Sequence, residues 1–166
     1  MANENEFVIT REFNASRNLM WQLWTQAKHL KKWFGPATAG LEIFSVKVSL
    51  QPGGVFHYGL KSPDGFEMWG KFVYKEIDEP NKLVFVASFS DASEGITVHP
   101  MSATWPKEVL STIIFTESEG KTTLHMTGVP INASDEEVKT FVEGMASMKQ
   151  GWGGTFGLLE TYLTTF

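Results

Sequence analysis

A periodic apolar pattern in the C-terminal stretch, residues 134–166, constrains this chain more than any other feature of its sequence. Ser134 and Glu137 have capping-box spacing, and Asp135 and Glu136 add negative charge to the first turn of a helix. Beyond them, apolar residues recur at steps of three and four, a spacing that places them on one broad helix face. These residues are Val138, Phe141, Val142, Met145, Met148, Trp152, Phe156, Leu159, Tyr162, Leu163 and Phe166. We therefore predict a long amphipathic helix that covers a sheet.

Small residues form a second stripe along the same predicted helix. Gly144, Ser147, Gly151 and Gly154 keep the three-and-four rhythm and lie about 120° around the axis from the apolar stripe. Each glycine costs a helix about 1 kcal/mol relative to alanine. Glycines repeated in register therefore indicate close backbone approach or open space beside the helix, and we expect this helix to roof a cavity.

The chain is rich in aromatic residues, with 13 Phe, 6 Trp and 3 Tyr among 166 residues. Such side chains fill large cores and also line pockets for apolar ligands. One domain over residues 1–166 is the default for this length, and a chain of this size buries roughly 70% of its unfolded surface. Its folding therefore needs no cofactor, metal or disulfide.

Charge and composition exclude several classes of partner. The net charge of −5, without a Lys/Arg block, argues against nucleic acid. The absence of cysteine excludes a disulfide framework, a thiol nucleophile and a zinc-thiolate site. The first residues are polar and acidic, unlike a signal peptide, and no apolar run reaches the length of a membrane span. We expect a cytoplasmic protein with no membrane partner.

The rest of the chain alternates between strand patterns and turn signals. A strand over Glu6–Asn14 precedes a helix capped by Asn14 or Ser16, and a shorter helix over Ala27–Trp33 ends at Gly35-Pro36. Six further strands are predicted over residues 41–50, 55–60, 66–77, 83–89, 109–116 and 122–128. Short turns between successive strands imply antiparallel pairing. The predicted fold is α+β: a curved antiparallel sheet of about seven strands, wrapped around the long C-terminal helix, with two short helices plugging one end.

Short motifs in a fixed order extend along most of the chain. They are Arg11-x-Phe13-x-Ala15, Trp21, Trp24-Thr25, Leu30-x-x-Trp33-Phe34-Gly35-Pro36, Leu50-x-Pro52-Gly53-Gly54-x-Phe56, Pro63-Asp64-Gly65, Glu76-Ile77, Pro80-x-x-Leu83, Gly120-Lys121-Thr122-Thr123-Leu124 and Gly151-Trp152-x-x-x-x-x-Leu158-Leu159-x-x-Tyr162-Leu163. In order and spacing the chain resembles the SRPBCC or START-like superfamily, and within it the activator of heat-shock-protein-90 ATPase homologue family. Ser16 departs from the family, which often has proline there, but serine can cap the helix.

The resemblance implies a single START-like domain with a helix-grip fold and a cavity between the sheet and the C-terminal helix. Relatives include carriers of apolar ligands, polyketide cyclases and aromatases, and co-chaperone domains, so the fold alone does not assign an activity.

Aromatic and methionine side chains give the clearest functional signal, because methionine adapts to varied apolar shapes. Of Met68 and Trp69, neighbours in one strand, only one can point inward. Tyr58 or His99 would orient a ligand. Four residues, Trp33, Phe34, Met101 and Trp105, would guard the mouth of the cavity. The predicted ligand-binding residues are Trp33, Phe34, Phe56, Tyr58, Trp69, His99, Met101, Trp105, Met126, Met148, Trp152 and Phe156.

No catalytic residue is predicted. The four histidines lack the spacing of a metal motif, and no Gly-x-Ser-x-Gly elbow or phosphate-binding loop is present. Glu67, Glu76 or Arg11 could supply acid/base chemistry only if one of them faced inward.

Three functions therefore remain open. The first is the binding of an apolar small molecule in the cavity. The second is a cyclase- or dehydratase-type enzyme, which requires a charged side chain in the cavity. The third is a co-chaperone-like interaction module, which requires an exposed apolar patch. The sequence also leaves open a homodimer and a chaperone partner.

Overall fold

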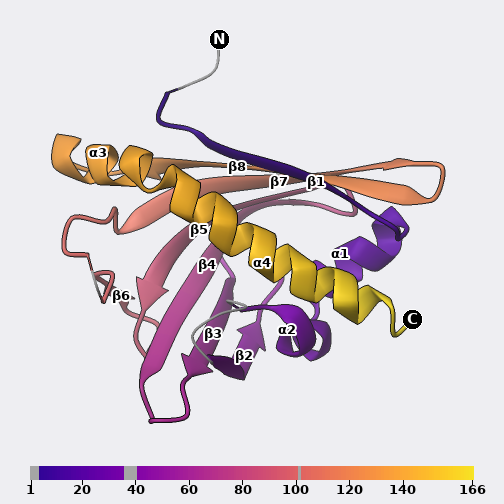
Figure 1. Ribbon diagram of the computed structural model, residues 1–166, viewed down its shortest axis with the longest axis horizontal. Coiled ribbons are helices and arrows are strands. Elements are labelled where there is room, and N and C mark those ends of the chain that lie inside the picture. Colours follow the sequence, from indigo (N-terminus) through magenta and orange to yellow (C-terminus); the bar gives the residue numbers. More distant parts are fainter. Residues whose placement is uncertain (1–3, 36–40, 101) are drawn as a thin grey trace.

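The computed structural model describes residues 4–35, 41–100 and 102–166. An antiparallel sheet curves around a C-terminal helix that lies across one of its faces (Figure 1). In chain order the elements are β1 (Phe7–Phe13), α1 (Arg17–Thr25), α2 (Ala27–Trp33), β2 (Glu42–Val48), β3 (Val55–Lys61), β4 (Glu67–Asp78), β5 (Lys82–Ser90), β6 (Ile96–Thr97), β7 (Glu108–Ser118), β8 (Lys121–Ile131), α3 (Asp135–Glu143) and α4 (Met145–Leu163). The predicted α+β helix-grip fold, with two short helices after the first strand, is confirmed.

The strand order across the sheet is β1-β8-β7-β5-β4-β3-β2, and β6 pairs with β5. The first strand thus joins the last, with Phe7 opposite Gly128 and Phe13 opposite Thr122. The seven predicted strands are all present. The eighth, β6, lies between the predicted strands 83–89 and 109–116, where no strand was predicted; its two residues are too few to show a period-two pattern.

Strand β1 shows how side-chain alternation positions the core. Phe7, Ile9 and Phe13 are buried, whereas Val8 and Glu12 are exposed. Because side chains alternate between the two faces of a strand, the buried set lies on the face covered by α4.

The two short helices close one end of the sheet (Figure 1). The Ser16 hydroxyl accepts a hydrogen bond from the Leu19 amide at 3.2 Å, so the predicted serine cap of α1 is present. Helix α1 buries Trp21 and Trp24, whose rings meet Phe115 of β7 at centroid distances of 6.0 and 6.4 Å. Helix α2 contacts β2 and α4. The helices therefore fill the space between the sheet and the C-terminal part of α4.

The C-terminal segment is not one continuous helix. Its predicted capping box is present: the Ser134 hydroxyl accepts from the Glu137 amide, and the Glu137 carboxylate accepts from the Ser134 amide. At Gly144, however, φ is −89° and ψ is 0°, and the segment divides into α3 and α4, which run in different directions (Figure 1). A Cβ on Gly144 would lie 3.0 Å from the Trp105 ring, so the missing side chain lets this ring pack against the junction.

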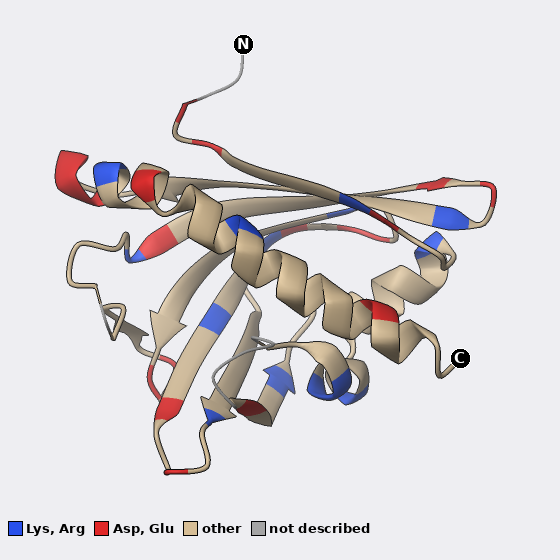
Figure 2. Cartoon of the chain, viewed as in Figure 1, with Lys and Arg blue, Asp and Glu red and all other residues tan. Residues whose placement is uncertain are grey.

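Helix α4 is almost uncharged, because Lys149 and Glu160 are its only charged residues (Figure 2). Even so, no helix in the described part of the chain is both long and apolar enough to span a bilayer.

Candidate ligand-binding pocket

A pocket of about 530 Å³ lies between the sheet and the junction of α3 and α4. Its sheet side is formed by β1, β3, β4, β5, β7 and β8. Its helix side includes Phe141, Gly144 and Met148. Loop residues His99 and Trp105 are half-buried and complete the wall.

Small side chains on the floor explain why the pocket is hollow. Ser111 of β7 lies opposite Gly128 of β8, and Ala87 of β5 lies opposite Val109 of β7. A Cβ on Gly128 would lie 3.2 Å from Val109 Cγ1 and 3.6 Å from Ser111 Oγ. Gly144 stands at the junction above this floor. We call this region the hollow end; it comprises Ala87, Ser111, Gly128 and Gly144 with the pocket that they border.

The other end of the same space is filled by large rings. Phe156 of α4 meets Phe13 of β1 edge-on at 5.6 Å, and Trp24 meets Trp33 at 4.8 Å. Trp152 separates the two regions, since it stacks on Trp24 at 6.3 Å and also lines the pocket. We call the filled region the packed end; it comprises Phe13, Trp24, Trp33, Phe115, Phe156 and Leu159, each at most 2% exposed.

The structure brings most of the predicted ligand-binding residues to the pocket wall. Those that line it are Phe34, Tyr58, His99, Trp105, Met126, Met148 and Trp152. Met101 lies outside the described residues. The other four predicted residues are placed elsewhere.

Trp33, Phe56 and Phe156 are core residues rather than pocket residues. Trp33 is 1% exposed and its indole N–H donates to the Leu23 carbonyl at 2.9 Å, so it does not guard a mouth. Phe56 lies behind the wall, against Phe34 at 5.1 Å. Phe156 belongs to the packed end. Their apolar character was interpreted correctly, but sequence spacing does not separate a filled part of a core from a hollow one.

Trp69 points away from the pocket. It lies opposite Gly59, and its ring stacks on His57 with centroids 5.0 Å apart and planes 14° apart. A Cβ on Gly59 would lie 2.8 Å from the Trp69 ring, so the glycine makes room for the indole. Met68, on the Tyr58 side of the sheet, is therefore the inward member of the Met68–Trp69 pair.

No Lys, Arg, Asp or Glu side chain lines the pocket among the described residues. Its two titratable side chains are those of Tyr58 and His99. Burial raises the pKa of Tyr58 to about 12 and lowers the pKa of His99 below its usual 6.5. Both side chains are therefore neutral at pH 7, and the wall carries no formal charge.

The acid/base candidates are all engaged elsewhere. Glu67 is exposed and accepts a hydrogen bond from the Trp69 indole at 3.1 Å. Glu76 forms an ion pair with Lys82 at 2.9 Å. Neither carboxylate lines the pocket. Within the described residues, no group of three or more His, Asp or Glu side chains is arranged to hold a metal ion.

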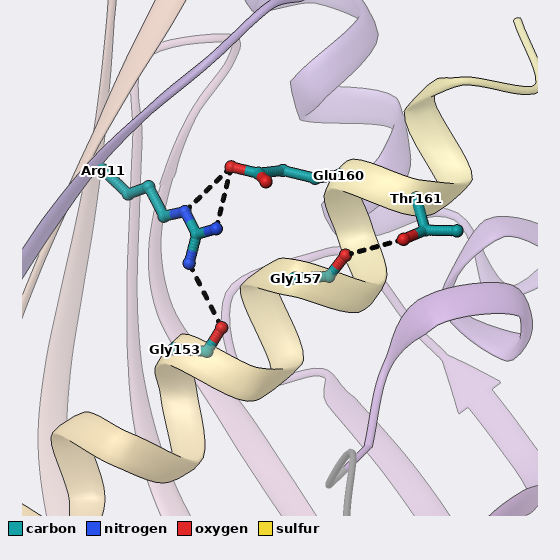
Figure 3. Close-up of polar contacts among 5 residues, drawn as sticks. All are labelled: Arg11, Gly153, Gly157, Glu160 and Thr161. Atoms are coloured by element: carbon teal, nitrogen blue, oxygen red, sulfur yellow. Dashed lines mark hydrogen bonds and ion pairs between the residues drawn. The ribbon is translucent and has the colours of Figure 1, made fainter.

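Arg11 faces inward but binds α4 rather than the pocket (Figure 3). Its Nε donates to Glu160 Oε1 at 2.9 Å, its Nη2 pairs with the same oxygen at 2.9 Å, and its Nη1 donates to the Gly153 carbonyl at 3.1 Å. Thr161 donates to the Gly157 carbonyl within the same helix. Arg11 thus clamps β1 to α4 without reaching the hollow end.

Sequence reasoning missed the small residues of the floor, although a signal for two of them exists. Glu119 and Gly120 lie between two strand patterns and indicate a two-residue hairpin turn, and in the structure both have positive φ, 54° and 78°, as such a turn requires. Counting back from this turn pairs Ser111 with Gly128, as observed. The other missed pocket residues that carry aromatic rings are Phe7, Phe72, Phe85, Phe89 and Phe141.

An open antiparallel sheet that grips a C-terminal helix defines a protein of the helix-grip, SRPBCC-like class. The family model described as "Activator of Hsp90 ATPase homolog 1-like protein" matches residues 14–164, and the chain belongs to that family. The resemblance inferred from the motifs is therefore confirmed.

Solved structures from several bacteria share this fold. Protein Ms6760 from Mycobacterium smegmatis has 25% identity and a TM-score of 0.77, over 98% of this chain and 93% of that chain. A protein from Rhodobacter sphaeroides has 17% identity and a TM-score of 0.79, over 99% and 95%. A protein from Staphylococcus epidermidis has 21% identity and a TM-score of 0.76, over 99% and 93%. No curated protein matches the chain.

Proposed function

We propose that this protein binds an apolar small molecule in the pocket between its sheet and the junction of α3 and α4. The observation that carries the proposal is a pocket of about 530 Å³ whose described lining is uncharged, beside a region of the same core that is tightly packed. That volume falls within the range of roughly 300–1,000 Å³ that is typical of small-molecule sites.

Desolvation of the ligand supplies the driving force, about 25 cal/mol for each Å² of apolar surface removed from water. Met126 on the sheet and Met148 on α4 both line the pocket, so flexible thioethers can adapt to the ligand's shape from both sides. Trp105, Trp152 and Phe34 add flat aromatic surface.

The alternatives have weaker support. A cyclase or dehydratase needs an acid or base poised near the substrate, and the described wall offers only neutral His99 and Tyr58 for this role. A chaperone partner, which the family's description brings to mind, needs a contiguous exposed patch. Large exposed apolar side chains such as Phe44 of β2, Ile96 of β6 and Phe166, which follows α4, come from different parts of the chain.

A cavity-filling substitution tests the proposal. Met148→Trp adds an indole to the roof of the pocket, where space exists, so the affinity for the neutral fluorescent probe N-phenyl-1-naphthylamine should fall at least about tenfold. The melting temperature should change by no more than a few degrees, because no packed side chain is displaced.

Gln150→Trp is the matched control, since Gln150 is exposed on the same helix and does not line the pocket. It should leave probe affinity unchanged. Equal affinity of the Met148→Trp variant and the unmodified protein would contradict the proposal, as would severe unfolding of that variant, which would mark position 148 as packed core.

A further inference from the structure

The charge of the pocket wall bears on which ligands it could hold. Its described side chains include no cation that could pair with a carboxylate and no anion that could pair with an amine. Arg11, the inward-facing cation of β1, is held by Glu160 and the Gly153 carbonyl. A charged ligand would lose its hydration without gaining a partner, a cost that apolar contacts do not recover.

One polar group on the wall, the Tyr58 hydroxyl, belongs to a side chain that its neighbours hold in place. The Tyr58 ring sits across the strand pair on Gly70, where a Cβ would overlap the hydroxyl. Phe34, Phe56 and Phe72 hold the ring, with centroids 4.9, 5.2 and 6.1 Å away. Among the described residues no group forms a hydrogen bond with the Tyr58 hydroxyl. Its O–H is thus a preorganised donor in an otherwise apolar part of the wall.

Two other polar side chains on the wall, Thr140 and Ser111, form hydrogen bonds within the protein. Thr140 donates to the Glu136 carbonyl at 3.0 Å and also bonds to Thr104 at 2.8 Å. The Ser111 hydroxyl points to the Val109 carbonyl, although at a long 3.5 Å. Tyr58 differs from these two side chains because the described residues offer its hydroxyl no hydrogen-bond partner, and its ring is fixed in place by its aromatic neighbours.

We propose that the pocket selects a neutral ligand with an aromatic or apolar body and one hydrogen-bond acceptor, such as a carbonyl, which receives the Tyr58 O–H. This inference rests on the proposed function and adds the class of ligand that the pocket prefers. The raised pKa of Tyr58, about 12, keeps the hydroxyl protonated, and hence a donor, at physiological pH.

Three naphthalenes of similar size test the inference by titration calorimetry at pH 7: 2-acetylnaphthalene, 2-ethylnaphthalene and 2-naphthoate. 2-Acetylnaphthalene should bind at least about tenfold more tightly than 2-naphthoate, because only the carboxylate anion must give up the hydration of a charged group on entering the pocket. Tyr58→Phe should weaken ketone binding about fivefold, the effect of one hydrogen bond, and leave the ethyl compound within about twofold.

Tyr162→Phe is the matched control. It removes a phenolic hydroxyl that bonds to His29 at 2.7 Å, far from the pocket lining, and should change none of the three affinities. If Tyr58→Phe weakened the binding of 2-acetylnaphthalene and of 2-ethylnaphthalene equally, the Tyr58 hydroxyl would not be the hydrogen-bond donor to the ketone. Tight binding of 2-naphthoate to the unmodified protein would overturn the selection against charge, whether or not the variant folds.

These outcomes are separate from failure of the proposed function. If the ketone and the ethyl compound bind equally and both resist Tyr58→Phe, the pocket still binds apolar molecules and only the specificity is wrong. If none of the three compounds binds, both the specificity and the small-molecule function are overturned.

Discussion

The packed end and the hollow end lie side by side under one C-terminal segment, yet one is solid and the other is empty. Side-chain size along two strands accounts for the difference. On the inward face of β7 the residues run from Ser111 through Ile113 to Phe115. On β8, the facing residues run from Gly128 through Met126 to Leu124. On β7 the inward side chains therefore grow from the hollow end toward the packed end, and on β8 a glycine at the hollow end is followed by two large side chains.

The helix side repeats this gradient. Phe156 and Leu159, near the packed end, have no exposed surface, whereas Gly144 at the opposite end brings no side chain to the junction. A void costs stability in proportion to its volume, so a chain that only had to fold would be expected to fill it. The comparison indicates that the hollow end is maintained by small residues on both sides, at the expense of stability.

The largest expected effect is on stability, and it is found by shortening one side chain to alanine at each end. Phe156→Ala should lower the free energy of unfolding by about 3–5 kcal/mol, because it opens a new cavity among Phe13, Trp24 and Trp152. Met148→Ala should cost only about 1 kcal/mol, since its half-buried side chain already borders empty space. Urea denaturation of both variants measures the two values, and equal losses would remove the distinction between the ends.

Most of the fold follows from local patterns. Alternation in the strands, turn residues and the three-and-four spacing of the C-terminal segment predict the elements, because each pattern reports one buried face. Ser16 and Ser134 both cap helices as predicted. Pairing of β1 with β8 does not follow, since those strands are separated by almost the whole chain and no turn sets their register.

The break at Gly144 was missed because the apolar spacing continues across it. At the break, a Cβ on Gly144 would lie 3.0 Å from the ring of Trp105, a residue far away in sequence, and local spacing does not report such a contact. Trp69 was predicted to face the pocket, but it does not. Because β4 carries apolar residues on both faces, alternation along the strand does not show which face is turned toward the core. For the site, the aromatic and methionine content predicts an apolar pocket wall. The empty volume of the pocket depends instead on residues such as Gly128, which have no side chain and give no apolar pattern in the sequence.

A smaller effect is expected from the clamp that fixes α4 over both ends. Arg11→Met keeps an apolar stem but removes the ion pair with Glu160 and the bond to the Gly153 carbonyl. Because both charged side chains are partly exposed, the loss of unfolding free energy should be about 1 kcal/mol. Thermal unfolding of Arg11→Met, Glu160→Gln and the double variant tests this, and the double variant should lose less than the sum of the two single variants.

Strict additivity of the Arg11→Met and Glu160→Gln effects would contradict a direct interaction between these side chains. Probe binding in the pocket should survive Arg11→Met, since Arg11 does not line it. Loss of binding without loss of stability would instead show that the hollow end depends on the clamp.

The smallest expected effect is on pH dependence and contrasts His99, which lines the hollow end, with His29, which lies outside both ends. Burial lowers the pKa of His99 in the hollow end, and burial followed by the charge of Lys28 lowers the pKa of His29, which lies beside Tyr162. In each case the unfolded chain takes up a proton at a higher pH than the folded protein. Stability should therefore be complete above the unfolded pKa of about 6.5, and should fall as the pH drops from there toward the folded pKa.

An apolar ligand in the pocket should sharpen this contrast, because it removes water from His99 and leaves His29 untouched. Imidazole titrations followed by ¹H–¹³C NMR, with and without 2-acetylnaphthalene, should show the pKa of His99 moving further down on binding while that of His29 stays constant. Parallel shifts at both histidines would mean that the ligand acts on the whole domain. A His99 pKa at or above 6.5 in the free protein would show that its ring is not shielded by Phe89 and Trp105 as the ring distances of 4.6 and 6.0 Å indicate.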